Sequence, residues 1–125
     1  MSFTVYIVDD EPMVLRPMKS LVNVFGYECK VYQEGASLLE DMSLEPLDGL
    51  ILADLRMPSM SGLQLHAALR EAGVRIPFVL ISGHADGNTL EIAMEQGVNG
   101  FLLKPFEPDE LLAVIEEYVP TNDVH

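Results

Sequence analysis

The chain has 125 residues, 49% of them hydrophobic, which is enough for one domain with a substantial buried core. Its 20 Asp and Glu residues outnumber 7 Lys and Arg residues and give a net charge of −13, which argues against a nucleic-acid-binding surface and favours cationic partners or ions. The single cysteine excludes an internal disulfide, and the lack of a signal-like start or a run of about 20 apolar residues predicts no membrane span, so a cytoplasmic location is expected.

Short apolar runs alternate with amphipathic segments from the first residues onward. The run 3–8 is β-branched and aromatic and too short for a helix, so it predicts a buried strand. Pro12 then opens a segment with apolar residues at helical spacing that ends at Gly26. Pro17 lies inside this predicted helix, where we expect a kink. Residues 28–32 alternate in polarity and predict a strand nearer the edge of a sheet.

The rest of the chain continues this alternation. Strands are predicted at 47–54, 76–82 and 100–103, and helices at 35–42, 62–73, 88–97 and 108–119. The helix predicted at 88–97 places Leu90, Ala93 and Met94 on one face. Five strand–helix pairs with continuously apolar strands predict a doubly wound α/β fold of (βα)5 type, with a parallel sheet covered by helices on both faces. Residues 1–119 are expected to form this domain, and 120–125 a tail or the start of a linker.

Polar side chains follow four of the predicted strands. They are Asp9, Asp10, Asp54, Ser82 and Lys104. With a sheet order of 2-1-3-4-5, these strand ends are neighbours spaced by about 4.8 Å at the edge where such sheets bind ligands. Three carboxylates in one pocket require a cation, and Mg²⁺, with Mn²⁺ as a substitute, prefers carboxylate oxygens. Together with a hydroxyl and an ammonium group, the acids predict a site of phosphoryl transfer in which a carboxylate is the nucleophile.

Each of these residues also has a structural interpretation, which the sequence leaves open. Asp9 and Asp10 resemble a cap for the helix that follows, Asp54 and Ser82 resemble turn residues, and Lys104 resembles a surface lysine. Only their joint occurrence at four strand ends favours the chemical interpretation.

Four motifs resemble the receiver domain of two-component response regulators. They are IVDDEP, LILADLRMPSMSG, FVLISGHAD and GFLLKPF, and together they span essentially the whole chain. The sequences of the segments DLRMPSMSG, SGH and KPFE are most similar to those of receivers joined to a LuxR-type helix-turn-helix output domain. The resemblance implies a flavodoxin-like and CheY-like fold with sheet order 2-1-3-4-5.

The resemblance also implies a role for each acidic residue. Asp54 would accept a phosphoryl group from a histidine kinase, and Lys104 would pair with the phosphoryl oxygens. Asp10, Asp54 and the backbone carbonyl of Arg56 would bind Mg²⁺ directly, while Asp9 would bind it through water.

Further positions of the family are filled as well. Ser82 and Phe101 would form the switch pair that responds to phosphorylation, and the peptide bond before Pro105 would be cis. Arg56 and His84 stand where the family tunes the lifetime of the phosphoaspartate, although both also fit as ordinary surface polar residues.

The family reads out phosphorylation at a face that here comprises 88–97, 100–106 and 108–118. The expected outcomes are homodimerisation or control of a DNA-binding output domain that this chain lacks, with DNA contacted only through that domain. A fragment of a transcription factor is therefore expected, with a stand-alone single-domain regulator as the alternative. In either case the chain is no enzyme beyond its own phosphotransfer and autodephosphorylation.

Two other classes of protein are disfavoured, each by one part of the sequence. A haloacid-dehalogenase-type phosphatase needs a second acid where Arg56 stands. A flavodoxin-like flavin binder needs a phosphate-binding loop after the first strand, where the sequence DDEPMV instead repels phosphate.

Overall fold

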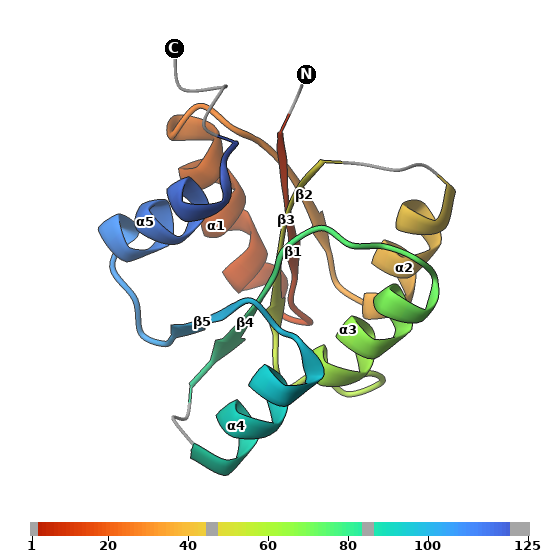
Figure 1. Cartoon of the computed structure of the whole chain (residues 1–125). Coiled ribbons are helices and arrows are strands. Elements are labelled where there is room, and N and C mark those ends of the chain that lie inside the picture. Colours follow the sequence, from red (N-terminus) through yellow and green to blue (C-terminus); the bar gives the residue numbers. More distant parts are fainter. Residues whose placement is uncertain (1–2, 45–47, 84–86, 121–125) are drawn as a thin grey trace.

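Five strands and five helices alternate along the chain in a computed structural model that describes residues 3–44, 48–83 and 87–120. They are β1 (Thr4–Val8), α1 (Pro12–Val24), β2 (Glu28–Tyr32), α2 (Gly35–Leu44), β3 (Gly49–Asp54), α3 (Gly62–Glu71), β4 (Phe78–Ser82), α4 (Gly87–Gln96), β5 (Gly100–Leu103) and α5 (Pro108–Tyr118). The strands form one parallel sheet in the order β2-β1-β3-β4-β5 (Figure 1). The predicted (βα)5 organisation and strand order are confirmed.

Helices cover both faces of the sheet, with α1 and α5 on one face and α2, α3 and α4 on the other (Figure 1). Side chains of β1 alternate between the two hydrophobic clusters that result. Val5 and Ile7 belong to the cluster beneath α1 and α5, and Tyr6 and Val8 belong to the cluster beneath the other three helices. Because both faces are covered, the inner strands β1, β3 and β4 are largely apolar, whereas the edge strand β2 alternates in polarity, as the sequence indicated.

The strand register aligns the carboxyl ends of the inner strands. Val8 of β1 pairs with Ala53 of β3, and Ser82 of β4 pairs with Leu103 of β5. The residues that follow β1, β3, β4 and β5 therefore emerge at one edge of the sheet. β2 lies at the outer side of β1, which confirms its predicted place at the sheet edge.

A proline precedes the first residue of β4. The strand predicted at 76–82 starts at Phe78, because Pro77 has no N–H to donate to the ladder, although its carbonyl accepts from Ile51 at 3.0 Å.

The apolar face of α4 is only partly buried. Of the three residues that the sequence places on one face, Ala93 is buried, Leu90 is half-buried and Met94 is 57% exposed. The helix lies over the outer part of the sheet (Figure 1), where only a narrow stripe of its surface meets the core. Its remaining apolar residues therefore lie at the protein surface.

The helix α1 is 13 residues long and runs unbroken through Pro17. A proline at this place removes the hydrogen bond that its N–H would donate to the carbonyl of Met13. Met13 is exposed, so water can hydrate that carbonyl instead. The expected kink stays a prediction. No helix within the described ranges is long and apolar enough to cross a membrane.

Candidate functional site

Three carboxylates gather at the carboxyl ends of β1 and β3. Asp9 and Asp10 directly follow β1, and Asp54 is the last residue of β3. Each acid offers one oxygen, and these three oxygens lie within 4.8 Å of one another. Asp9 is buried, and the other two are partly buried. The structure therefore brings together the three acids that the sequence analysis singled out.

Two of these acids are held in place by their own turns. The Asp9 N–H donates to the carbonyl of Tyr32 at 3.0 Å, and its Oδ1 accepts from the N–H of Glu11 at 3.0 Å. The Oδ1 of Asp54 accepts from the N–H of Arg56 at 3.3 Å. Asp54 thus has the turn role that the sequence left open, whereas Asp9 does not cap α1, whose N-cap is Glu11. Each of these hydrogen bonds occupies only one oxygen of its carboxylate.

The second oxygen of each of these acids faces Lys104, which follows β5. The Nζ of Lys104 lies 3.5 Å from Oδ2 of Asp9 and 3.4 Å from Oδ2 of Asp54. The backbone N–H of Lys104 donates to the carbonyl of Ser82 at 2.8 Å, which fixes the end of β5 beside the end of β4. The peptide bond between Lys104 and Pro105 is cis.

The pKa of the Lys104 ammonium reflects these neighbours. Partial burial by itself lowers this pKa, but the negative charges of Asp54 and Asp9 and their hydrogen bonds outweigh the burial. The pKa is therefore raised, and Lys104 is a cation at neutral pH. The surface-lysine interpretation does not describe this residue, because its charge is directed into the acidic cluster.

The other residues implied by the family resemblance lie around this cluster. Ser82 is buried at the end of β4, and Phe101 on β5 is half-buried against the cluster beneath α2, α3 and α4. Phe101 pairs with Leu80, and strand alternation places Ser82 and Phe101 on the same face of the sheet. Arg56 is exposed, and His84 lies outside the described residues.

An open hollow of about 600 Å³ adjoins the acids. Its lining comes from the β1 end, the loop between β3 and α3, and the first turns of α3 and α4: Asp10, Leu55, Arg56, Met57, Pro58, Ser61, Leu63 and Thr89. Thr89 was not foreseen, because a threonine within a helical pattern carries no signal of its own. Of the three acids, Asp10 lines this hollow.

A second residue that the sequence analysis missed is Gly62, the first residue of α3. A Cβ at this position would lie 2.6 Å from a methyl carbon of Leu80 and 2.7 Å from the backbone oxygen of Asp54. The N–H of Gly62 donates to the carbonyl of Leu55 at 3.0 Å. Glycine thus allows α3 to start directly against the strand end that carries Asp54, a requirement that only the folded chain reveals.

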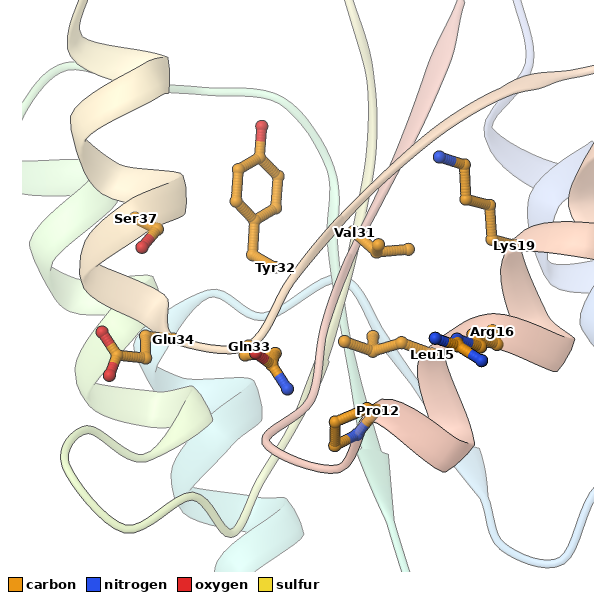
Figure 2. Close-up of a pocket in the computed structure, with 9 residues that line it drawn as sticks. All are labelled: Pro12, Leu15, Arg16, Lys19, Val31, Tyr32, Gln33, Glu34 and Ser37. Carbon is orange, nitrogen blue, oxygen red and sulfur yellow. The ribbon is translucent and has the colours of Figure 1, made fainter.

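A further hollow of about 760 Å³ lies between α1, β2 and the start of α2 (Figure 2). Arg16 and Lys19 of α1 line one side, Ser37 of α2 lines another, and Leu15 and Val31 supply apolar surface between them (Figure 2). It shares no lining residue with the hollow beside the acids. This hollow is therefore separate from the one beside the acids.

Comparisons with known proteins agree with this arrangement. The family model described as the response regulator receiver domain matches residues 5–116. Response regulator protein TmoT of Ectopseudomonas mendocina is 38% identical over 111 residues, which cover 89% of this chain and 50% of TmoT. Transcriptional regulatory protein FixJ of Rhizobium meliloti is 34% identical over 114 residues, which cover 91% of this chain and 55% of FixJ. The chain thus spans about half the length of the curated relatives it matches.

Solved structures give the same result. The crystal structure of FixJ-N superposes with a TM-score of 0.85 at 32% sequence identity and covers 97% of this chain and 98% of that one. The matched family model extends from β1 into α5 and includes all three acids, Ser82 and Lys104. The chain belongs to the response regulator receiver domain family.

Proposed function

We propose that Asp54 accepts a phosphoryl group from a histidine kinase in a reaction that depends on Mg²⁺. The observation that carries this proposal is the position of Asp54, 3.4 Å from the Lys104 ammonium and with an oxygen within 4.8 Å of oxygens of Asp9 and Asp10. A nucleophilic carboxylate, acids that hold a cation and a fixed ammonium group are the parts that phosphoryl transfer requires.

The donor set fits a magnesium ion. Three carboxylates and one ammonium carry −3 + 1 = −2 charges, which one divalent cation balances. Carboxylate oxygens are the ligands that Mg²⁺ favours, and the three that lie within 4.8 Å of one another could hold the ion. Mn²⁺, which also takes oxygen ligands, is proposed as a substitute.

The family resemblance implies different roles for the three acids. Asp9, which is buried, would hold the cation through water. Asp10 and Asp54, together with the backbone carbonyl of Arg56, would bind the ion directly. A bound divalent cation supplies positive charge to the phosphoryl oxygens during transfer.

The transfer itself forms one bond and breaks another. A carboxylate oxygen of Asp54 attacks the phosphorus of the donor phosphohistidine in line, forming an acyl phosphate as the phosphorus–nitrogen bond breaks. The departing imidazole of the donor takes up a proton. Lys104, whose charge is secured by its raised pKa, neutralises part of the charge on the phosphoryl oxygens. The chain then catalyses only its own phosphorylation and dephosphorylation.

Ser82 and Phe101 are proposed to transmit the modification. The Ser82 hydroxyl would turn toward the phosphoryl group and Phe101 would move inward. These movements would shift the equilibrium between two conformations of the face formed by α4, β5 and α5. Arg56 and His84 would tune the phosphoaspartate lifetime. Replacing both by Ala is expected to change the dephosphorylation rate, and an unchanged rate would contradict their role.

The whole protein is proposed to be a transcription regulator. The relatives that the chain matches are about twice its length, and FixJ is named a transcriptional regulatory protein. Phosphorylation would act through homodimerisation or through an output domain that alone contacts DNA. The net charge of −13 makes direct DNA binding by this chain unfavourable.

The central test is phosphorylation by a small donor. The chain is incubated with acetyl phosphate and Mg²⁺, and its intact mass is measured beside that of Asp54→Asn and of wild type with EDTA. We expect the mass of one phosphoryl group to appear only in wild type with metal. An unmodified wild type, or an Asp54→Asn chain that is modified equally fast, would refute the proposal.

A further inference from the structure

His66 is the buried histidine of the described chain, with 0% of its surface exposed. It lies on α3, and its ring meets the ring of Phe78 on β4 edge to face, with centroids 5.0 Å apart and planes at 72°. A histidine in the helical pattern of residues 62–73 would ordinarily be assigned to the solvent side. Its burial calls for a polar partner, because an imidazole without one is costly to bury.

The partner is Gln96, the last residue of α4. Its Nε2 lies 2.9 Å from the carbonyl oxygen of Leu63 and 2.8 Å from Nδ1 of His66. A side-chain amide nitrogen has two hydrogens, and the Leu63 carbonyl can only accept. That carbonyl fixes the orientation of the amide, so the second hydrogen points to Nδ1. His66 is therefore the neutral tautomer that carries its proton on Nε2.

The other ring nitrogen lies beneath the end of α4. Nε2 of His66 is buried and has no hydrogen-bond partner in the described part of the chain. The ring's Cε1 would lie 3.9 Å from a Cβ added at Gly97, the residue with φ of +102° at which α4 ends. Gln96 and Gly97 thus place the C-terminal end of α4 directly over the imidazole.

The charges around the ring oppose its protonation. Burial lowers the pKa of His66, and the nearby Arg70 lowers it further, while the backbone of Gly97 raises it by less. Across the described ranges no carboxylate forms an ion pair with the ring. Of the ring's neighbours, Arg70 on α3 is positively charged, Phe78 on β4 is apolar, and Gln96 and Gly97 at the end of α4 are uncharged.

We propose that His66 is a proton-sensitive latch between α3 and the C-terminal end of α4. When His66 is neutral, Nδ1 accepts from Gln96 and holds the helix end. When it is protonated, Nδ1 becomes a donor that faces a donor, and the buried cation lies near Arg70. Rotating the amide would satisfy the imidazolium but turn an amide oxygen toward the Leu63 carbonyl. Protonation therefore releases the end of α4.

Because α4 is part of the proposed output face, protonation of His66 would be a second signal that acts on this face. The inference concerns the attachment of α4 in the unmodified chain, so it does not depend on phosphorylation of Asp54. Loss of phosphorylation in the acetyl phosphate test would leave it intact.

The test is a pH titration of the isotopically labelled full chain by NMR, from about pH 8 to about pH 5. We expect the His66 ring to titrate below its ordinary pKa, and the Gln96 side-chain amide and the Gly97 backbone amide to shift in step with it. Hydrogen-exchange protection of the last turn of α4 should fall about tenfold per pH unit between about pH 6.5 and the lower pKa of the closed latch. A His66 that titrates at or above about 6.5, or α4 amides that ignore its titration, would overturn the proposal.

A matched pair of variants separates the latch from a merely structural role. Gln96→Glu keeps the shape but supplies a carboxylate, which accepts from the imidazolium. It should raise the pKa of His66 and reverse the response, so that acidification increases protection of α4. His66→Phe should abolish the pH response of the last turn of α4. If His66→Phe does not fold, Gln96→Glu still decides, because a Gln96→Glu chain that responds to pH like wild type contradicts the latch.

Discussion

The Nζ of Lys104 lies 3.4 Å from Oδ2 of Asp54, which joins the end of β5 to the end of β3 across the intervening β4. Asp9 repeats this geometry at 3.5 Å, and in both acids Oδ1 is engaged by a backbone N–H of the following turn. The backbone thus orients each carboxylate and the ammonium group balances part of its charge. Lys104 therefore supports the acids while it competes with a cation for them.

This competition predicts two opposite effects of Lys104→Met. Removal of a positive charge 3.4 Å from Oδ2 of Asp54 relieves its repulsion of a bound divalent cation, so Mg²⁺ should bind several-fold more tightly. The rate of phosphorylation should fall, because the phosphoryl oxygens lose a neutralising contact. Isothermal titration and intact-mass kinetics measure the two effects. Lys30→Met, at an exposed position on β2, makes the same change in net charge and should alter neither.

Metal binding should also stabilise the fold. A ligand that binds only the folded chain adds about 2.7 kcal/mol to the free energy of unfolding at a hundredfold excess over its Kd. Thermal unfolding with Mg²⁺ and with EDTA should therefore differ for wild type. The difference should shrink in Asp10→Asn, which removes a proposed direct ligand, and persist in Asp109→Asn, which changes an acid in the first turn of α5. An equal metal response in Asp10→Asn would exclude this residue as a ligand.

The sequence predicted the sheet well because its strands are buried on both faces. The run around Ile7 is apolar without interruption, and acids follow it at the carboxyl end of the strand. The same logic located Asp54 and Lys104, since the topology of a parallel sheet gathers strand ends irrespective of the intervening sequence.

Features that depend on contacts between distant segments could not be predicted in this way. Met94 fits the apolar period of its helix but is exposed, because the width of the buried stripe depends on where α4 lies over the sheet. His66 is buried, and the polar partner that offsets its burial is Gln96, 30 residues later in the chain. Gly62 contacts the Asp54 backbone across a turn, and periodicity contains no information on such a close approach.

The close approach at Gly62 predicts a destabilising Gly62→Ala substitution. The added Cβ would collide with the backbone oxygen of Asp54, so α3 would have to move away from the strand end, at a cost of about 1–3 kcal/mol. Urea unfolding measures this loss, and slower phosphorylation should accompany it because Asp54 shifts. Gly87→Ala, at a helical glycine with nothing within 4 Å of its added Cβ, is the control and should be neutral or slightly stabilising. Equal stability of the two variants would contradict the steric argument.

Cys29 gives a pH dependence whose sign can be worked out. Burial raises the pKa of its thiol from 9.0 to about 11, and the charge of Lys19 only partly offsets this. Between these values the unfolded chain loses the proton and the folded chain keeps it, so stability is lost as pH rises. The slope is at most about 1.4 kcal/mol per pH unit. The difference in unfolding free energy between wild type and Cys29→Ala should therefore shrink from about pH 9 upward, and a constant difference would contradict the prediction.

The proposed homodimerisation has an exposed apolar surface to act through. Ile92 on α4 is 48% exposed and Leu103 on β5 is 43% exposed, both on elements of the proposed output face. Burying them against a partner would contribute to association in proportion to the apolar area removed from water. We expect Ile92→Ser and Leu103→Ser to accept phosphoryl groups normally but to weaken phosphorylation-dependent dimerisation at least tenfold in sedimentation experiments. Val24→Ser, at an 80% exposed apolar position on α1, should dimerise like wild type, and an equal loss there would place the interface elsewhere.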